Sequence, residues 1–185
     1  MIKYFLILIL MMFPVLLPAQ VFGSGETLRK GKSSVGFNVF APQVNENQKA
    51  YLFIHMDHGI AESCDIDVKV GFTGDETYLG GDVEWQLSQK IVFVSFTAGM
   101  HKFDNFGLDA ILTLMLPMGG ISGVYMGSDL DVEFVEKETV TPFWLFIGMN
   151  ISLGRKTSLL VCLEGAMNID AANKQARRLQ LDTAE

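Results

Sequence analysis

Basic residues and cysteines are scarce in this sequence of 185 residues. It has 14 lysine and arginine residues against 21 aspartates and glutamates, which gives a formal net charge of −7. An acidic surface repels phosphate backbones, so we expect no nucleic-acid partner. The two cysteines, Cys64 and Cys162, lie far apart in the chain, and their spacing is not that of a zinc site. We expect two free thiols, with a disulfide between them as the alternative.

A run of apolar residues long enough for a membrane-spanning helix is also missing. The longest run, Tyr4 to Leu17, has about fourteen residues and follows a basic start at Lys3, which is typical of a secretory signal peptide. Val21 and Gly23 suit the small-residue positions before a cleavage site, so we predict a signal peptide over residues 1–23. A retained anchor helix is the alternative. No cysteine follows the run, which argues against a bacterial lipoprotein.

Apolar and polar residues alternate through most of the remaining chain, most clearly over 65–72, 82–87 and 129–134. Successive side chains of a strand point to opposite sides of its sheet, so this pattern predicts strands with one apolar and one polar face. Turn-rich pieces separate the strands, and no helical period interrupts them. We therefore predict one all-β domain over residues 24–170, built as an antiparallel meander of hairpins. The expected strands cover residues 33–41, 49–58, 64–73, 77–88, 91–101, 105–116, 121–135, 141–152 and 156–168.

The two expected faces differ sharply in composition. The apolar face carries almost no charge, whereas the polar face combines acidic residues with glycine. The expected apolar face consists of Val68, Val70, Phe72, Leu79, Val83, Trp85, Leu87, Val92, Val94, Phe96, Leu108, Leu112, Leu114, Leu116, Phe143, Leu145, Ile147, Met149 and Ile151. The expected polar face consists of Asp67, Lys69, Asp82, Glu84, Ser95, Thr97, Asp109, Thr113, Asp129, Asp131, Glu133, Asn150 and Glu164, with Gly71, Gly80, Gly99, Gly127 and Gly148 between them.

Two kinds of barrel can be built from these faces. A soluble, lipocalin-like binding barrel turns the apolar face inward, and a transmembrane barrel turns it outward. Large side chains occupy the apolar positions of every strand and would overpack a narrow interior. The polar face has few lysines and many glycine, serine and threonine residues, which is unlike the water-facing surface of a soluble barrel. We therefore predict an antiparallel up-and-down transmembrane β-barrel of 8 to 10 strands with an acidic, filled interior. A secreted or periplasmic lipocalin-like barrel is the alternative.

The signal peptide, the repeated hairpins and the stretches 71–82 and 123–130 resemble the small outer-membrane β-barrel proteins of Gram-negative bacteria. The resemblance covers roughly residues 33–168. It implies an integral, porin-like protein of the cell outer membrane, with a structural or small-solute role and no assigned substrate. The partners it implies are outer-membrane lipid and the barrel assembly machinery. One departure is the atypical polar C-terminal tail over 171–185, where family members end on an alternating strand with a terminal aromatic residue.

Three carboxylates, Asp129, Asp131 and Glu133, share one face of an expected strand. Calcium loops wrap their ligands around the ion from a tight turn, whereas an extended strand spaces same-face residues about 6.6 Å apart. We expect these carboxylates to line the interior and to hold no metal, with a metal site as the alternative.

Histidine is concentrated at His55 and His58, and His101 lies on another expected strand. His55 shares a face with Asp57, and His58 opposes them. Because nothing marks a nucleophile beside this pair, we expect no catalytic residue, no enzymatic activity and no cofactor. An outer-membrane hydrolase that uses His55 and Asp57 is the second alternative. The sequence assigns no ligand and no binding residue.

Overall fold

The computed structural model describes residues 26–40, 51–73, 76–102, 105–118, 122–135, 138–152 and 158–166. The predicted signal peptide over 1–23 and the polar tail over 171–185 lie outside the described residues. Among the described residues, no helix has the length and apolar character needed to cross a membrane.

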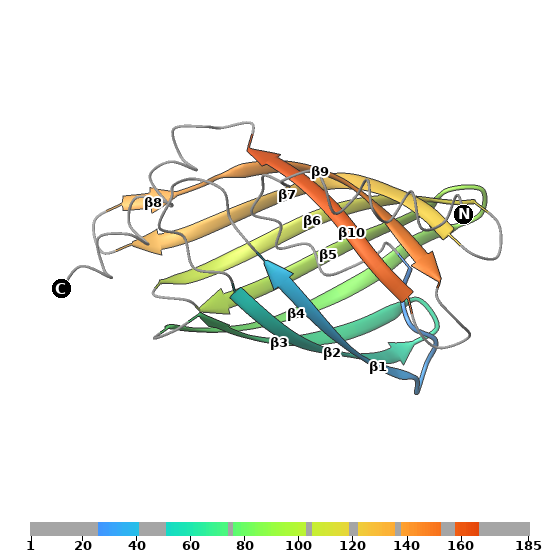
Figure 1. Ribbon diagram of the computed structural model, residues 1–185, viewed down its shortest axis with the longest axis horizontal. Coiled ribbons are helices and arrows are strands. Elements are labelled where there is room, and N and C mark those ends of the chain that lie inside the picture. The colour runs from blue at the N-terminus through green and yellow to red at the C-terminus, as the bar shows by residue number, and fades with distance from the viewer. Residues whose placement is uncertain are drawn as a thin grey trace, which may run out of the picture.

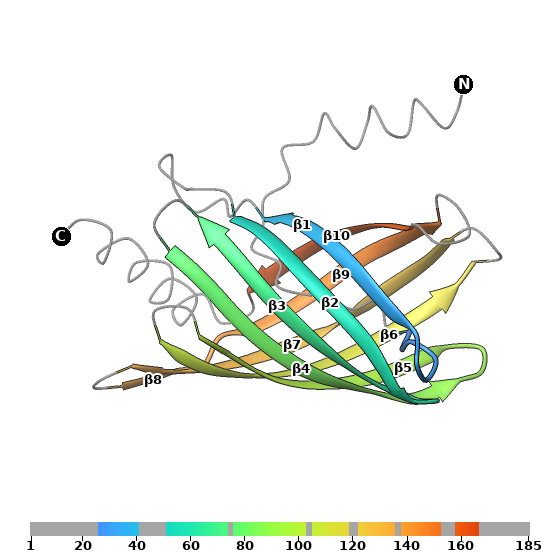
Figure 2. The same cartoon turned by 90° about the horizontal axis from the view of Figure 1, so that it is seen from below.

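Antiparallel strands that run up and down in chain order form one curled sheet, whose last strand returns toward its first (Figure 1 and Figure 2). This confirms the predicted all-β, up-and-down arrangement. The strands are β1 (Ser33–Phe40), β2 (Tyr51–Ala61), β3 (Cys64–Thr73), β4 (Glu76–Gln89), β5 (Phe93–Lys102), β6 (Phe106–Pro117), β7 (Ser122–Val135), β8 (Glu138–Val140), β9 (Phe143–Ser152) and β10 (Ser158–Ala166).

Residues 138–140 form the short strand β8, although a loop was expected between the strands 121–135 and 141–152. It pairs with the end of β7, from Val135 opposite Glu138 to Glu133 opposite Val140, and β9 then continues along β7 from Leu130. Pro142 lies between the two strands and has no N–H to donate, so the ladder is interrupted there. β8 and β9 are therefore two consecutive segments of one interrupted strand, both paired with β7.

The sheet has two open edges within its described residues. The pairing path begins at β1, ends at β10 and contains no ladder between these two strands among the described residues. Every pairing along the path is antiparallel, and β1 and β10 are eight pairings apart, so they run in the same direction. We name the two ends of the sheet by their connections. The β3–β4 rim also carries the β5–β6 connection, and the β2–β3 rim also carries the β4–β5 and β6–β7 connections.

The apolar side chains lie on the outer face of the curl, and the charged ones on the face that it encloses. Leu112 and Ile147 are 42% and 50% exposed, whereas Lys69 and Asp129 are 4% and 3% exposed. This is the reverse of the usual arrangement in water, where charged residues are almost never fully buried. The exposed apolar residues of the strands include Val35, Phe37, Leu52, Ile54, Met56, Val68, Phe72, Leu79, Trp85, Phe96, Met100, Leu108, Leu112, Leu114, Met126, Leu130, Leu145, Ile147 and Met149.

A smaller apolar cluster, formed by Ile111, Met115, Tyr125 and Phe146, fills the enclosed side of β6, β7 and β9. These residues interrupt the polar face that the alternation predicts. The Tyr125 ring tilts against Phe146 with 6.3 Å between centroids, and its hydroxyl donates a hydrogen bond to the carbonyl of Val161 on β10, at 3.2 Å. The cluster therefore joins β10 to the rest of the sheet.

Glycine provides the room for these large side chains. Gly148 lies directly opposite Tyr125, and a Cβ added there would collide with the Tyr125 ring and with the backbone carbonyl of Val161. We expect Gly148→Ala to lower the free energy of unfolding by about 1–3 kcal/mol, because neither neighbour can retreat within the packed ladder. The matched control is Gly81→Ala, where the nearest atom is 3.5 Å away, and we expect its effect to stay within about 0.5 kcal/mol. Urea unfolding followed by tryptophan fluorescence measures both, and equal effects would contradict the assignment.

Candidate functional site

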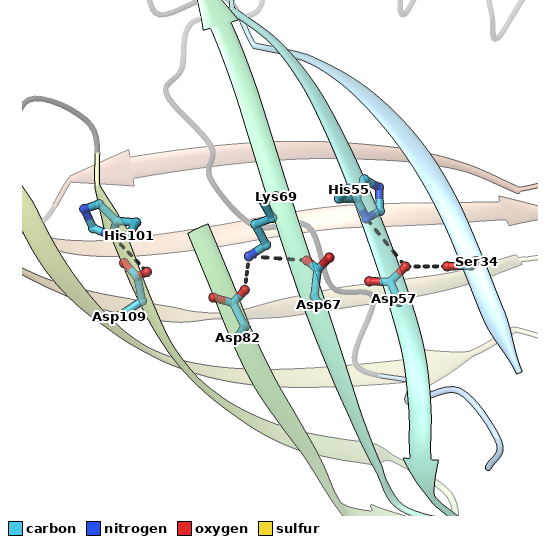
Figure 3. Close-up of polar contacts among 8 residues, drawn as sticks. All are labelled: Ser34, His55, Asp57, Asp67, Lys69, Asp82, His101 and Asp109. Atoms are coloured by element: carbon cyan, nitrogen blue, oxygen red, sulfur yellow. Dashed lines mark hydrogen bonds and ion pairs between the residues drawn. The ribbon is translucent and has the colours of Figure 1, made fainter. Parts of the chain in front are cut away.

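A band of charged side chains crosses the enclosed face of the sheet from β2 to β7, and Figure 3 shows the part of it that lies on β2 to β6. Charged residues on the same strand are separated by an even number of positions, and such residues point to the same face of a sheet. The inner face carries the carboxylates of Asp57, Asp65, Asp67, Asp82, Glu84, Asp109, Asp129, Asp131 and Glu133. Lys69 is the only buried lysine or arginine among the described residues. The band is therefore strongly acidic.

Lys69 lies between two carboxylates from adjoining strands. Asp67 on β3 is directly opposite Asp82 on β4, an arrangement of like charges that destabilises a ladder. The Lys69 ammonium makes an ion pair with Asp82 and lies 3.6 Å from Asp67 Oδ2. All three side chains are almost completely enclosed, so this ion pair is shielded from water (Figure 3).

His101 on β5 lies beside a similar pair of opposed carboxylates, on β6 and β7. Asp109 on β6 is directly opposite Asp131 on β7, and the His101 ring lies beside both. Its Nδ1 is 3.0 Å from Asp109 Oδ2, and its Nε2 is 3.8 Å from Asp131 Oδ1. The ring also stacks on Tyr78 with 5.6 Å between centroids, and it covers the open Cα of Gly107. These contacts fix the orientation of the imidazole.

His55 and Asp57 share the inner face, as the alternation predicts, but their order does not suit nucleophilic catalysis. Ser34 donates a hydrogen bond to Asp57, and His55 Nδ1 lies 3.5 Å from the same carboxylate (Figure 3). The carboxylate therefore lies between the hydroxyl and the imidazole, whereas an activated serine needs the imidazole in the middle. His58 points away from this group and lies 2.8 Å from the Ser33 hydroxyl.

The segment before β1 closes the interior at the β2–β3 rim, which the sequence did not indicate. The N–H of Thr27 donates to Gln86 Oε1 at 3.0 Å, and the N–H of Leu28 donates to Asp65 Oδ2 at 2.8 Å. Gly31 and Gly59 complete the attachment through backbone hydrogen bonds of 2.7 and 2.9 Å. Thr27 is buried as a result.

Two groups of side chains in the described part of the chain have the donor atoms and the spacing to hold a metal ion. They are His55 with Asp57 and Asp67, and His101 with Asp109 and Asp131, and in each group the ligand atoms lie within 4.8 Å of one another. The second group is fully buried and the first is half-buried. Imidazole and carboxylate together suit first-row divalent cations.

The alternation of residues predicted which side chains form the charged band, but not which of them contact one another. Asp129 and Asp131 lie on the inner face as expected. The contact between Asp131 on β7 and His101 on β5 was not predicted. A signal was present, because folding 93–117 into a hairpin around 103–105 brings His101 close to Asp109. Cys64 and Cys162 are free thiols, as expected.

Comparison of the chain with protein-family models, with curated proteins and with solved structures found no match.

Proposed function

We propose that the chain is an integral β-barrel protein of the bacterial outer membrane, with a structural or small-solute role. The observation that carries this proposal is the reversed distribution of side chains, in which Leu112 and Ile147 are exposed while Lys69 and Asp129 are enclosed. Apolar side chains over a whole outer wall far exceed the few hundred Å² of contiguous apolar surface usual for a soluble protein. Hydrocarbon solvates such a wall without cost.

The dimensions of the strands support the same conclusion. β3, β5 and β9 have 10 residues each and β6 has 12, the range that a strand tilted by about 45° needs to cross a hydrocarbon layer. The ladders satisfy the backbone groups between them, as hydrocarbon requires.

Aromatic side chains on the outer face are placed toward both rims. Phe106 stacks on Phe134 near the β3–β4 rim, with 6.0 Å between ring centroids. Trp85 stacks on Phe96 on the side of the β2–β3 rim, with 6.1 Å between centroids. Outer-membrane barrels carry aromatic girdles at both membrane interfaces, and these two pairs match that pattern.

The enclosed face limits what could pass through the barrel. Its excess of carboxylates disfavours anions and favours cations. Tyr78, Lys69 and His101 project into the space, and the Ile111, Met115, Tyr125 and Phe146 cluster fills another part. We therefore expect the barrel to pass small cations at most, and we expect the strands of its wall to have a structural role.

The two alternatives receive less support. A lipocalin-like carrier needs an apolar row facing inward, but Leu112 and Ile147 face outward. A hydrolase based on His55 and Asp57 needs an imidazole next to a nucleophile, but Ser34 contacts the carboxylate instead.

The two tryptophans of the sequence allow a direct test of which face meets lipid. Trp85 is on the outer face and 40% exposed, whereas Trp144 is on the inner face opposite Asp129. In vesicles of brominated-acyl phospholipid, we expect strong quenching of Trp85 in Trp144→Phe and weak quenching of Trp144 in Trp85→Phe. The full chain should also need detergent to leave the membrane fraction. Equal quenching of the two variants, or release from membranes by salt alone, would overturn the proposal.

A further inference from the structure

On the enclosed face, β5, β6 and β7 bring an imidazole and two carboxylates together, with a third carboxylate next to them on β7. His101 lies beside Asp109 and Asp131, and ligand atoms of these three residues lie within 4.8 Å of one another. Asp129 is the next inward residue of β7 after Asp131, and both Asp109 and Asp131 are close enough to act on its charge. The four side chains come from three strands that the ladders hold in fixed register.

Asp129, next to this group, has a buried oxygen atom that no described residue reaches. Its side chain is only 3% exposed, and its Oδ1 atom has no hydrogen-bond partner among the described residues. A buried carboxylate oxygen without a partner is strongly unfavourable unless a cation or a hydrogen-bond donor reaches it. Asp109 Oδ1 is likewise buried without a hydrogen-bond partner among the described residues.

Among the described residues, the basic groups that act on Asp129 are Lys69 and His101. The ammonium of Lys69 is already engaged by Asp82 and Asp67 on the neighbouring strands (Figure 3). His101 supplies at most one positive charge to three carboxylates. A neutral His101 that binds one divalent cation would change the net charge of the three carboxylates from −3 to −1.

The orientation of His101 suits a metal ligand. A carboxylate can only accept, so the contact of 3.0 Å implies that Nδ1–H donates to Asp109 Oδ2 and that Nε2 turns toward Asp131. Carboxylates often hold metal-binding histidines in this way, through the ring nitrogen that does not ligate. Nε2 and Asp131 Oδ1 are 3.8 Å apart, and two atoms bound to one ion at about 2.1 Å in tetrahedral geometry are about 3.4 Å apart. A small side-chain rotation closes this difference.

We propose that the barrel interior contains a binding site for a first-row divalent cation. His101 Nε2 and Asp131 are its ligands, Asp129 adds an oxygen once its side chain rotates toward them, and Asp109 orients the imidazole. Nitrogen and oxygen donors without a thiolate favour Zn²⁺, Mn²⁺ or Fe²⁺ over soft ions. The metal site weighed from the sequence used only the carboxylates of one strand, and it did not include His101 from β5.

Calorimetric titration of the metal-stripped full chain in detergent with Zn²⁺ tests the site. We expect one ion per chain. Affinity should fall by at least about tenfold in His101→Gln and Asp131→Asn, and by about 10–100-fold in Asp109→Asn, which removes only the orienting carboxylate. The matched control is His58→Gln, which removes a histidine outside both candidate metal groups and should leave the affinity unchanged.

Asp129→Asn keeps the experiment decisive even if other variants fail to fold. It removes a buried charge and preserves shape, so the metal-free protein should be at least as stable as the parent. At the same time it should bind Zn²⁺ at least about tenfold more weakly and lose the stabilisation that bound metal gives.

Absence of Zn²⁺ binding would overturn the proposal and leave His101 as an imidazolium held between carboxylates. Binding that is lost in His55→Gln, but kept in His101→Gln and Asp129→Asn, would also overturn it. The titration does not depend on where the protein resides, so its outcome is separable from the test of the membrane location.

Discussion

Replacing Leu112 by arginine is expected to lower the free energy of unfolding in lipid vesicles by about 2–4 kcal/mol. Leu112 lies midway along β6 on the outer face and is 42% exposed. In a bilayer this position meets the hydrocarbon centre, where a guanidinium loses its hydration. Urea unfolding of the vesicle-bound protein, followed by tryptophan fluorescence, measures the loss.

The same substitution at Leu116 provides the control within one strand. Leu116 is equally apolar and 49% exposed, but it lies one residue before the end of β6. An arginine there reaches the lipid headgroups, so we expect a cost of only about 0–1 kcal/mol. A protein whose outer face meets water should tolerate arginine equally well at both positions. A small and equal effect at Leu112 and Leu116 is therefore the result that contradicts membrane insertion.

Replacing Lys69 by methionine is expected to lower the free energy of unfolding by about 3–5 kcal/mol. Methionine retains most of the volume but removes the charge that separates Asp67 from Asp82. These carboxylates are directly opposite each other and enclosed, so the variant leaves two like charges buried together. The same unfolding measurement applies.

Adding Asp82→Asn to Lys69→Met distinguishes charge from packing. The double variant leaves Asp67 without a like-charged neighbour across the ladder, so it should recover a large part of the lost free energy. Lys102→Met is the matched control, because Lys102 is exposed at the end of β5, and its effect should stay within about 0.5 kcal/mol. A double variant no more stable than Lys69→Met would show that Lys69 acts through its packing alone.

The strands could be predicted closely because their alternation is unusually regular. The prediction of 64–73 coincides with β3, and most other boundaries differ by one to three residues. The difficult places are those where local backbone geometry overrides the pattern. At Leu87 the register of β4 against β5 shifts between Gln86 and Ser88. Gln86 stabilises this shift by donating to the carbonyls of Ser88 and Val94, a long-range contact with no signature in the sequence.

The inner face could be predicted in composition but not in contacts. Alternation places Asp109, Asp131 and Lys69 on one face, but it cannot say which carboxylate a flexible ammonium will reach. It also misses the apolar part of the interior, because Tyr125 and Phe146 occupy positions of polar parity and fit there only through the glycines opposite them. Such pairings depend on the register between strands, which cannot be read from the residues of one strand alone.

The parallel directions of β1 and β10 have a consequence for topology. A hairpin wall with an even number of strands brings both ends of its chain back to the same side of a bilayer. In a wall that spans a bilayer as we propose, the parallel directions of β1 and β10 would place regions fused before Ser33 and after Ala166 in different aqueous spaces.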